Sequence, residues 1–566
     1  MSEISALQIG LSALLAQRRG LDVTGHNIAN ANTEGYSRQR VDLAANGGPI
    51  VPALFSRWTG SGLGVTVTGV SRAYDAFLDA RSMLEHGSNG SLTRTHELLG
   101  RVESLFNEPS DNGVQHLLDD YWAAWREVAN NPGDNSGRVL LVERAKTLAG
   151  AINKASAGLT AISTASIEQL SATVAGVNTT AQNIALLNAK VQTAAASGIA
   201  HQDLLDQRDV LVRKLADKLG STSRIEADGT IDVFLGGGAI VRGNRAEALK
   251  VDTSTATVAV QWARDGSPAG VTGGEVSAFV DTVNDMIPRY LAGLDAIATN
   301  LRDGVNSVHA ALSGTIAVGS QDLTAAGTLS FGLRVNGTTY PDVSLTGADW
   351  SGVGGAAALQ AALQTALDTS TGTAGVVTAT VTGGNGTPLT IALAPGNPAD
   401  SVNVATVSGN PGLGLLLSDV LVGADGVGGR QFFTGTNSAT LAVAPDVLAS
   451  PSAVGAAAST AGPLDGSGAL RVAALGQLPA GVNAIYRAYI TGLGVEGQSV
   501  AGRLQVQAEA TSQADNARNA QSGVNLDEEM TNMMMYQHAY SAASRFITVI
   551  DDVLATLVER TGLVGR

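Results

Sequence analysis

The sequence predicts a mainly α-helical protein with an inserted β region. Three observations lead to this prediction. Apolar residues recur every three or four positions at both ends of the chain, and long central stretches keep the same spacing. A further segment, rich in Gly and Thr, consists of short strand-like runs separated by Gly-rich turns. The first spacing puts apolar side chains on one helix face, whereas short runs between Gly-rich turns are typical of strands. We therefore expect terminal helices that form a coiled coil, a long helical bundle with a small β part, and a separate β domain.

The N-terminal segment has the periodicity of one long helix. Its apolar seam, interrupted at Arg18 and Gly25, consists of Ile4, Leu7, Leu11, Leu14, Leu21 and Ile28. Asparagine and glycine tolerate the left-handed backbone that ends a helix. We expect the helix to end in a tight turn that needs a positive φ at Gly35. The residues assigned to this turn are Asn30, Asn32, Gly35 and Tyr36.

The last fifty residues predict a second long helix. Asn525 is in the position of an N-cap, and Glu528 stands three residues later, as in a capping box. The acidic residues 527–529 suit the positive end of the helix dipole. The apolar seam of this helix consists of Leu526, Met530, Met533, Tyr540, Ile547, Ile550, Leu554 and Leu557.

Two arrangements satisfy the terminal periodicity. The two helices pack on a globular core of their own chain, or they pack on each other and on neighbouring subunits. Burying one seam of six aliphatic side chains stabilises the N-terminal helix by less than the ordering of its backbone costs. We therefore expect both ends to remain disordered until other surfaces cover them, and to form an assembly interface with each other and with neighbouring copies.

Further helices and strands divide the middle of the chain. Helical periodicity covers much of 106–220, 276–312 and 481–520, and Ser110 or Asp111 is the expected cap of the first of these helices. Trp122 and Trp125, three residues apart, are expected in the core. Three domains are predicted. The terminal coiled-coil domain comprises 1–45 and 515–566, and the helical bundle comprises 46–314 and 471–514, with a β segment at about 221–275. An inserted β domain covers 315–470.

Composition excludes several classes of function. The net charge is −15 and no long Lys/Arg run occurs, which disfavours a nucleic-acid partner. No continuous apolar stretch is long enough to insert in a membrane, and the first residues lack the pattern of a cleaved leader. The chain has no cysteine. We expect no catalytic residue, cofactor or metal: the histidines are scattered, and Gly492–Gly497, which matches G-x-G-x-x-G, is expected to be a loop before a helix.

Both ends carry long motifs that resemble one known family. The N-terminal segment resembles the signature of flagellar rod, hook and hook-associated axial proteins. It starts at residue 7 and reads LQIGLSALLAQRRGLDVTGHNIANANTEGYSRQRVDL. The C-terminal segment resembles the corresponding segment of the same proteins. It starts at residue 522 and reads SGVNLDEEMTNMMMYQHAYSAASRFITVIDDVLATLVER. Stretches at 106–149, 203–220 and 496–513, including the LDQRD sequence, narrow the resemblance to the member at the hook–filament junction.

The resemblance implies a structural function. The terminal coiled coil would be an inner domain and the β domain an outer one. The chain would join hook to filament by coupled folding and assembly of its terminal helices. Its expected partners are copies of itself in a ring or tube, hook protein, hook-associated protein 3, and an export chaperone that binds the C-terminal segment. The expected location is the extracellular flagellum, reached by type III export without a cleaved signal peptide.

Two alternatives remain open from the residues. One is another axial subunit of the distal rod or hook type, against which the LDQRD sequence and the hairpin around residues 130–134 argue. The other is a surface protein with a glycan-binding or hydrolytic insert at 315–470, for which Asp342, Asp349 and Trp350 are the candidates. A methionine run at 533–535 is expected either to fill the core or to form a flexible interaction face.

Overall fold

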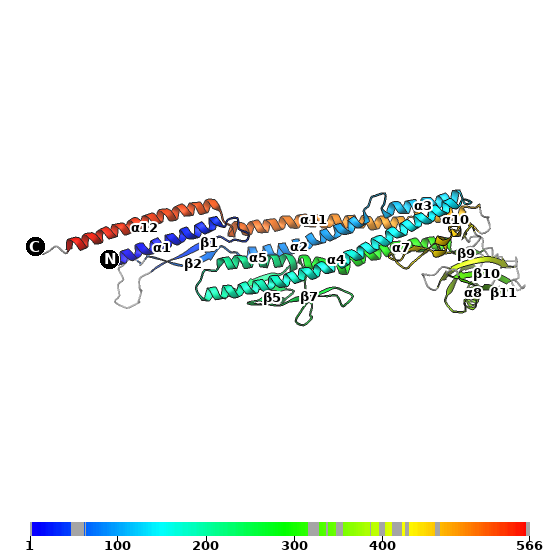
Figure 1. Ribbon diagram of the computed structural model, residues 1–566, viewed down its shortest axis with the longest axis horizontal. Helices are drawn as coiled ribbons and strands as arrows, with labels where there is room; N and C mark the ends of the chain where they lie inside the picture. The colour runs from blue at the N-terminus through cyan, green and yellow to red at the C-terminus, as the bar shows by residue number, and fades with distance from the viewer. Residues whose placement is uncertain are drawn as a thin grey trace. The chain divides into compact units, whose positions relative to one another are not determined.

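Helices dominate the computed structural model of the chain (Figure 1), and the prediction of a mainly α protein with inserted β structure is confirmed. The residues that the structure describes are 3–46, 62, 64–314, 328–335, 338–346, 355–384, 387–395, 402–409, 421–424, 430–458 and 464–561. The chain divides into two compact units. The first comprises Met1–His96, Ser166–Asp281 and Val500–Arg566, and the second comprises Glu97–Ala165 and Thr282–Ser499.

The first unit contains both terminal helices. Its helices are α1 (Glu3–Ala29), α5 (Gln202–Leu219), α6 (Gly274–Asp281) and α12 (Leu526–Thr561), with parts of α2 (Ala76–Phe106), α4 (Asn135–Ala196) and α11 (Val482–Ser522). Its strands are β1 (Gln39–Ala45), β2 (Val65–Arg72), β3 (Thr222–Ile225), β4 (Ile231–Leu235), β5 (Gly238–Arg242), β6 (Arg245–Ala246), β7 (Leu249–Asp252) and β8 (Ala259–Trp262).

The antiparallel strands of the first unit form three small sheets. The hairpin β1–β2 pairs Val41 with Val70, β3 to β6 form a four-stranded sheet in sequence order, and β7 pairs with β8. Gly236 and Gly237 join β4 to β5 with φ values of 53° and 86°, the positive angles that a tight two-residue hairpin requires. The sequence analysis did not predict the β1–β2 hairpin.

The C-terminal half of α4 supports these sheets. The buried residues on its inner face keep the three- and four-residue spacing: they are Leu170, Val174, Val177, Ala181, Ile184 and Val191. Asn178 uses its amide like a strand backbone, because Nδ2 donates to the Leu249 carbonyl at 2.8 Å and Oδ1 accepts from the Leu249 amide at 2.8 Å. Asn188 donates to the Ile231 carbonyl in the same way. The helix thereby fixes the positions of β4 and β7.

The second unit contains the inserted strands. Its helices are α3 (Val114–Asn130), a π-helical turn (Thr282–Met286), α7 (Ile287–His309), α8 (Gly355–Thr371), α9 (Pro445–Ala449) and α10 (Ser467–Ala474). Its strands are β9 (Ala311–Gly314), β10 (Thr328–Val335), β11 (Thr338–Thr346), β12 (Val377–Gly384), β13 (Thr387–Pro395), β14 (Val402–Gly409), β15 (Leu421–Val422), β16 (Phe433–Thr434), β17 (Ala442–Val443) and β18 (Ala457–Ala458).

An aromatic cluster forms the core around α3. Trp125 is fully buried, and its ring centroid lies 5.2 Å from that of Phe432. Trp122 is also buried and donates its indole N–H to Asn483 Oδ1 at 2.8 Å. The expected cap at Ser110 or Asp111 is wrong, because α3 begins after Gly113. The Glu108 carboxylate, seven residues upstream, accepts from the amide of Gln115 instead.

The inserted region is not purely β. Its strands form the antiparallel sheets β11-β10-β14 and β12-β13-β9, and the short pairs β15-β18 and β16-β17 lie in the same unit. The segment between β11 and β12 is helix α8, which lies within the segment predicted as an inserted β domain. Alanine favours helix, and Leu359, Leu363 and Leu367 place one buried apolar stripe at four-residue spacing. Asp342 lies in β11, whereas Asp349 and Trp350 lie outside the described residues.

The G-x-G-x-x-G sequence lies inside a helix. Gly492–Gly497 falls within α11, so the expected loop at this place is wrong. Ala and long straight side chains on both sides keep the segment helical at a cost of about 1 kcal/mol for each glycine. A helix interior has no free amide groups to hold a phosphate. Across the described ranges, no helix is long and apolar enough to cross a membrane, and no group of three His, Asp or Glu side chains is placed to hold a metal ion.

A buried histidine makes the second unit sensitive to acid. His309 donates from Nδ1 to the Arg430 carbonyl, and its Nε2 accepts from the Gly455 amide at 2.8 Å. Burial lowers the pKa of His309 to about 4. The unfolded chain, with a histidine pKa near 6.5, therefore binds more protons than the folded chain between these two values.

We expect the second unit to lose up to about 3 kcal/mol of folding stability as the pH falls from 7 to 4. The loss begins below the unfolded pKa and is complete at the folded pKa. Urea unfolding followed by tryptophan fluorescence measures it, because Trp125 contacts the His309 ring. In His309→Gln the loss should shrink, whereas in His96→Gln, a change at an exposed site, it should not. An equal loss in both variants would contradict the assignment.

Candidate functional site

The two ends of the chain pack side by side as α1 and α12 (Figure 1). Small residues occupy the buried positions of α1 over the first twenty residues, which are Ala6, Gly10, Ala16 and Gly20, and the two glycines of this group face α12. A Cβ atom at Gly10 would lie 2.6 Å from Ile547 Cγ1, and one at Gly20 would lie 2.6 Å from Tyr536 Cε1. The absence of side chains at these glycines therefore allows the two helices to approach closely.

The predicted seams and the contact face of the pair differ. On α1, Leu11 is half exposed, Leu7, Leu14, Leu21 and Ile28 are partly buried, and the side chain of Ile4 lies outside the described residues. On α12, the structure brings Met533, Ile547, Ile550 and Leu554 into partly buried positions, and leaves Leu526, Met530, Tyr540 and Leu557 exposed. The face of small residues meets α12, because it permits the shorter distance between helices.

The turn after α1 has the geometry that its sequence requires. The helix ends at Ala29, and Asn30 donates from Nδ2 to the His26 carbonyl at 3.0 Å. Asn32 lies within the turn. Gly35 has a φ of 79°, and a Cβ atom there would lie 2.1 Å from Val210 Cγ2. Both backbone conformation and lack of space therefore demand glycine at this position.

Asn27 connects α1, β1 and α12 at the base of the pair. Its side chain is buried, and Nδ2 donates to the Gln39 carbonyl at 2.8 Å and to Glu529 Oε2 at 3.0 Å. Oδ1 accepts from the Gln39 amide at 2.9 Å and from the Tyr36 hydroxyl at 2.7 Å. Burial, with smaller effects of Asp206, Asp203 and Glu529, raises the pKa of Tyr36, so its hydroxyl stays protonated and donates. All four hydrogen-bonding positions of the Asn27 amide are occupied.

Arg38 holds the first turn of α12. Its Nε lies 2.7 Å from Glu529 Oε1, and its Nη1 lies 2.9 Å from Glu528 Oε2. Asn525 caps the helix, since its Oδ1 accepts from the amides of Asp527 and Glu528 at 3.0 and 3.3 Å. The Glu528 carboxylate, expected to complete a capping box, pairs with Arg38 instead. The guanidinium offers a stronger, charge-assisted bond than a backbone amide does.

The LDQRD sequence on α5 fixes the base from the other side. Asp206 accepts from the Ser37 amide at 3.1 Å and pairs with Arg72, at the end of β2, at 3.1 Å. Asp209 pairs with the same arginine at 2.6 Å. Arg208, fully buried, donates to the Gly229 carbonyl at 2.7 Å. Because buried charges are costly unless paired, these residues form one network that positions β2 and the turn after α1.

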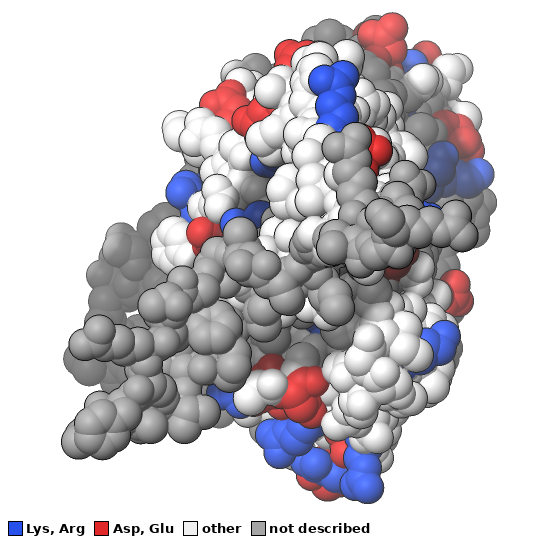
Figure 2. All heavy atoms as spheres, turned by 90° about the vertical axis from the view of Figure 1, so that its left-hand side faces the viewer, with Lys and Arg blue, Asp and Glu red and all other residues white. Residues whose placement is uncertain are grey.

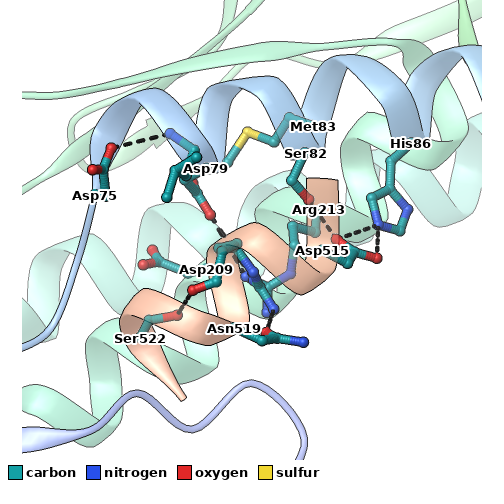
Figure 3. Close-up of polar contacts among 12 residues, drawn as sticks. Asp75, Asp79, Ser82, Met83, His86, Asp209, Arg213, Asp515, Asn519 and Ser522 are labelled. Carbon is teal, nitrogen blue, oxygen red and sulfur yellow. Dashed lines mark hydrogen bonds and ion pairs between the residues drawn. The ribbon is translucent and has the colours of Figure 1, made fainter. Parts of the chain in front are cut away.

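A second polar network joins α2, α5 and α11 (Figure 3). His86 on α2 lies 2.7 Å from Asp217 of α5 through Nδ1, and 3.1 Å from Asp515 of α11 through Nε2. Ser82 donates to Asp515 at 2.7 Å. Hydrogen bonds to Asp217 and Asp515 raise the pKa of His86 to about 9. A charged imidazole between two carboxylates therefore ties the C-terminal part of α11 to two other helices.

Three family models match segments along this chain. One describes the flagellar hook-associated protein FlgK helical domain and matches residues 99–316. One for flagella basal body rod proteins matches 7–36, and one for the C-terminal part of flagellar basal body rod FlgEFG proteins matches 518–560. Flagellar hook-associated protein 1 of Bacillus subtilis is 27% identical over 600 residues, in an alignment that covers 100% of both chains. These matches cover both ends and the middle of the chain, and each describes a flagellar protein.

Two further proteins are similar over smaller parts. Flagellar hook-associated protein 1 of Salmonella typhimurium is 28% identical over 255 residues, which are 44% of this chain and 45% of that protein. The solved structure of the flagellar hook junction protein FlgK from Burkholderia pseudomallei covers 79% of this chain and 100% of its own, with 18% identity and a TM-score of 0.47. The protein is a structural component of the flagellum, as the matched family models and relatives indicate.

The terminal pair of α1 and α12 presents many apolar side chains to solvent. We call this group the exposed apolar set: Leu11, Leu15, Met530, Met534, Met535, Tyr540, Phe546, Val549, Val553 and Leu557. On the face drawn in Figure 2, Lys and Arg side chains lie in small groups beside Asp and Glu side chains. An apolar group of this size on a helix pair is typical of a surface that meets another protein.

Sequence reasoning missed the polar residues at the base. Asn27, Arg38 and Glu529 are near the predicted turn and cap, but no spacing rule connects residues so far apart in the chain. A partial signal was present, because Asn27 is a polar residue inside an apolar repeat. The LDQRD sequence was noted for its resemblance, and its buried ion pairs were not predicted.

We expect Gly20→Ala to loosen the terminal pair by about 1–3 kcal/mol, because the new methyl group overlaps the Tyr536 ring. Hydrogen exchange of the α12 amides in the purified chain measures the effect. Gly25→Ala is the matched control, since a Cβ atom there meets nothing within 4 Å. This control should gain about 0.5–1 kcal/mol of helix stability. Equal α12 protection in the two variants would refute the close contact.

We expect the first unit to lose stability in alkali. The folded pKa of His86 lies near 9 and the unfolded value near 6.5, so its contribution is fully present below pH 6.5 and disappears as the pH rises through 9. After allowance for solvent screening the contribution is about 1 kcal/mol. Urea unfolding of wild type and His86→Gln measures it: the difference between them should shrink from pH 7 to pH 10. A difference that stays constant would rule out the charged bridge.

Proposed function

We propose that this chain is the adaptor that joins the hook of the flagellum to its filament. The observation that supports this proposal is the exposed apolar set on α1 and α12. The pair is held by close contacts at Gly10 and Gly20 and by the polar base, and the side chains of the exposed apolar set remain open to solvent. A structural subunit of a polymer needs such a surface, because burying it on assembly drives association.

The terminal helices complete their packing during assembly. In the free chain, each helix gains little apolar burial from the other, so the ends pay much of their ordering entropy only when neighbours cover the exposed apolar set. Assembly then stabilises the folded ends by mass action. The neighbours are copies of this chain in a ring or tube, hook protein on one side, and hook-associated protein 3 on the other.

The proposed arrangement of inner and outer parts follows the predicted domains. Residues 1–45 and 515–566 form the inner, coiled-coil domain, residues 46–314 and 471–514 form the helical bundle, and residues 315–470 form an outer β domain. The chain leaves the cell through the flagellar type III apparatus. An export chaperone covers the C-terminal segment before assembly, which suits its exposed apolar side chains.

We expect Val549→Asp to abolish incorporation into flagella while leaving secretion intact. Val549 is 57% exposed, so the carboxylate costs the free chain little, but it would be buried without a partner in the assembly. The measurement is the amount of variant in purified flagella, relative to the culture medium, in cells that make only the variant. We expect a fall of at least about tenfold, since a buried unpaired charge costs several kcal/mol.

Val139→Asp is the matched control, because Val139 is similarly exposed, at 44%, on α4 of the second unit. This variant should be incorporated normally. Leu14→Asp and Leu554→Asp, at partly buried positions of the pair, should also block incorporation. Normal filaments on cells that carry Val549→Asp would reject the proposed function.

A further inference from the structure

The methionines of this chain are concentrated on the C-terminal helix. Of seven methionines in the sequence, four lie within six residues of α12: Met530, Met533, Met534 and Met535. Two of the others, Met83 and Met286, belong to the cores of the first and second units. The thioether is the softest and most polarisable group among the apolar side chains, and it is the one that mild oxidants attack.

Their exposure separates the methionines into two groups. Met530, Met534 and Met535 are 58%, 54% and 54% exposed, whereas Met83 and Met286 are 2% and 6% exposed. The Met83 sulfur also accepts a hydrogen bond from the Ser223 hydroxyl at 3.3 Å. A peroxide in solution therefore reaches the three sulfurs of α12 and is kept from the two in the cores.

We propose that Met530, Met534 and Met535 form an oxidation site that controls whether the chain can assemble. The oxidant class is a peroxide. A sulfur lone pair attacks one peroxide oxygen, the S–O bond forms as the O–O bond breaks, and the second oxygen leaves as water after taking a proton. Sulfur is oxidised to the sulfoxide by two electrons and the peroxide is reduced. The inference rests on the proposed function, since its consequence is a loss of assembly.

The effect follows from where these residues lie. All three belong to the exposed apolar set, which meets neighbouring subunits in the proposed assembly. A sulfoxide turns a flexible apolar side chain into a polar one, so its burial against an apolar neighbour leaves a strong acceptor without a partner. Assembly in turn would cover the sulfurs, so the free chain is the vulnerable form. Enzymatic reduction of the sulfoxide restores the thioether and, with it, the apolar surface.

The first experiment measures the order of oxidation in the purified full-length chain. Hydrogen peroxide is added for increasing times, and peptide mass mapping gives the fraction of each methionine that is oxidised. We expect Met530, Met534 and Met535 to react at least about tenfold faster than Met83 and Met286, with Met533 between the two groups because it is partly buried. Equal rates at all sites, or faster reaction in the cores, would overturn the proposal without touching the proposed function.

The second experiment tests the consequence. Wild type and a triple variant with Met530→Leu, Met534→Leu and Met535→Leu are added, with and without peroxide treatment, to cells that carry hooks but lack this protein. Leucine keeps the size and the apolar character of methionine. We expect treated wild type to lose at least about fivefold in incorporation and the treated triple variant to keep it. Sulfoxide reductase should restore the treated wild type, which tests the idea even where the variant is impaired.

Full incorporation of the oxidised wild type, or failure of the reductase to restore it, would overturn the oxidation site while the proposed function stands. Failure of untreated wild type to incorporate at all would count against the proposed function instead. The order of oxidation in the first experiment would then still hold or fail by itself.

Discussion

A buried carboxylate, Glu529, is the point on which the terminal part of the structure depends. A buried charge is unfavourable unless neighbouring groups bind it, and here Arg38 and Asn27 supply the partners. Asn27 lies in the last turn of α1, Arg38 directly precedes β1, and Glu529 lies in the first turn of α12, so binding this one charge fixes three elements relative to each other. Through the Ser37 amide, which donates to Asp206, the same base is joined to the ion pairs of α5.

The close contact above this base decides what the terminal pair offers to other molecules. Gly10 and Gly20 make room for Ile547 and Tyr536 of α12, while the exposed apolar set of the pair stays in contact with solvent. A wider, leucine-lined interface would have hidden those side chains within a single chain. The pair is thus held by shape and by polar bonds at its base, and its apolar surface remains available for association and open to chemical attack.

Sequence patterns indicated the existence of helices better than their contacts. The three- and four-residue spacing along the C-terminal half of α4 matches its buried face, since that face packs on the small sheets that contain β4 and β7. On α1 the same spacing predicted the wrong contact face. A second stripe of Ala and Gly residues runs along this helix, and it contacts α12 because small side chains allow a shorter distance between the helices. Helix α8 was missed because its Thr- and Gly-rich surroundings resemble strands. Gly492–Gly497 was predicted to be a loop, although its three glycines lie inside helix α11, where each glycine costs stability but does not end the helix.

The sequence by itself determined the features that depend on neighbouring residues. The left-handed turn at Gly35, the cap at Asn525 and the helical character of both ends follow from local backbone chemistry. The tertiary structure decided which face of α1 meets α12. It also decided that the Glu528 carboxylate pairs with Arg38 instead of completing a capping box. Asn27 and Glu529 are 502 residues apart in the chain, and their bond depends on how the whole first unit brings two distant backbones together. Local patterns contain no record of that proximity.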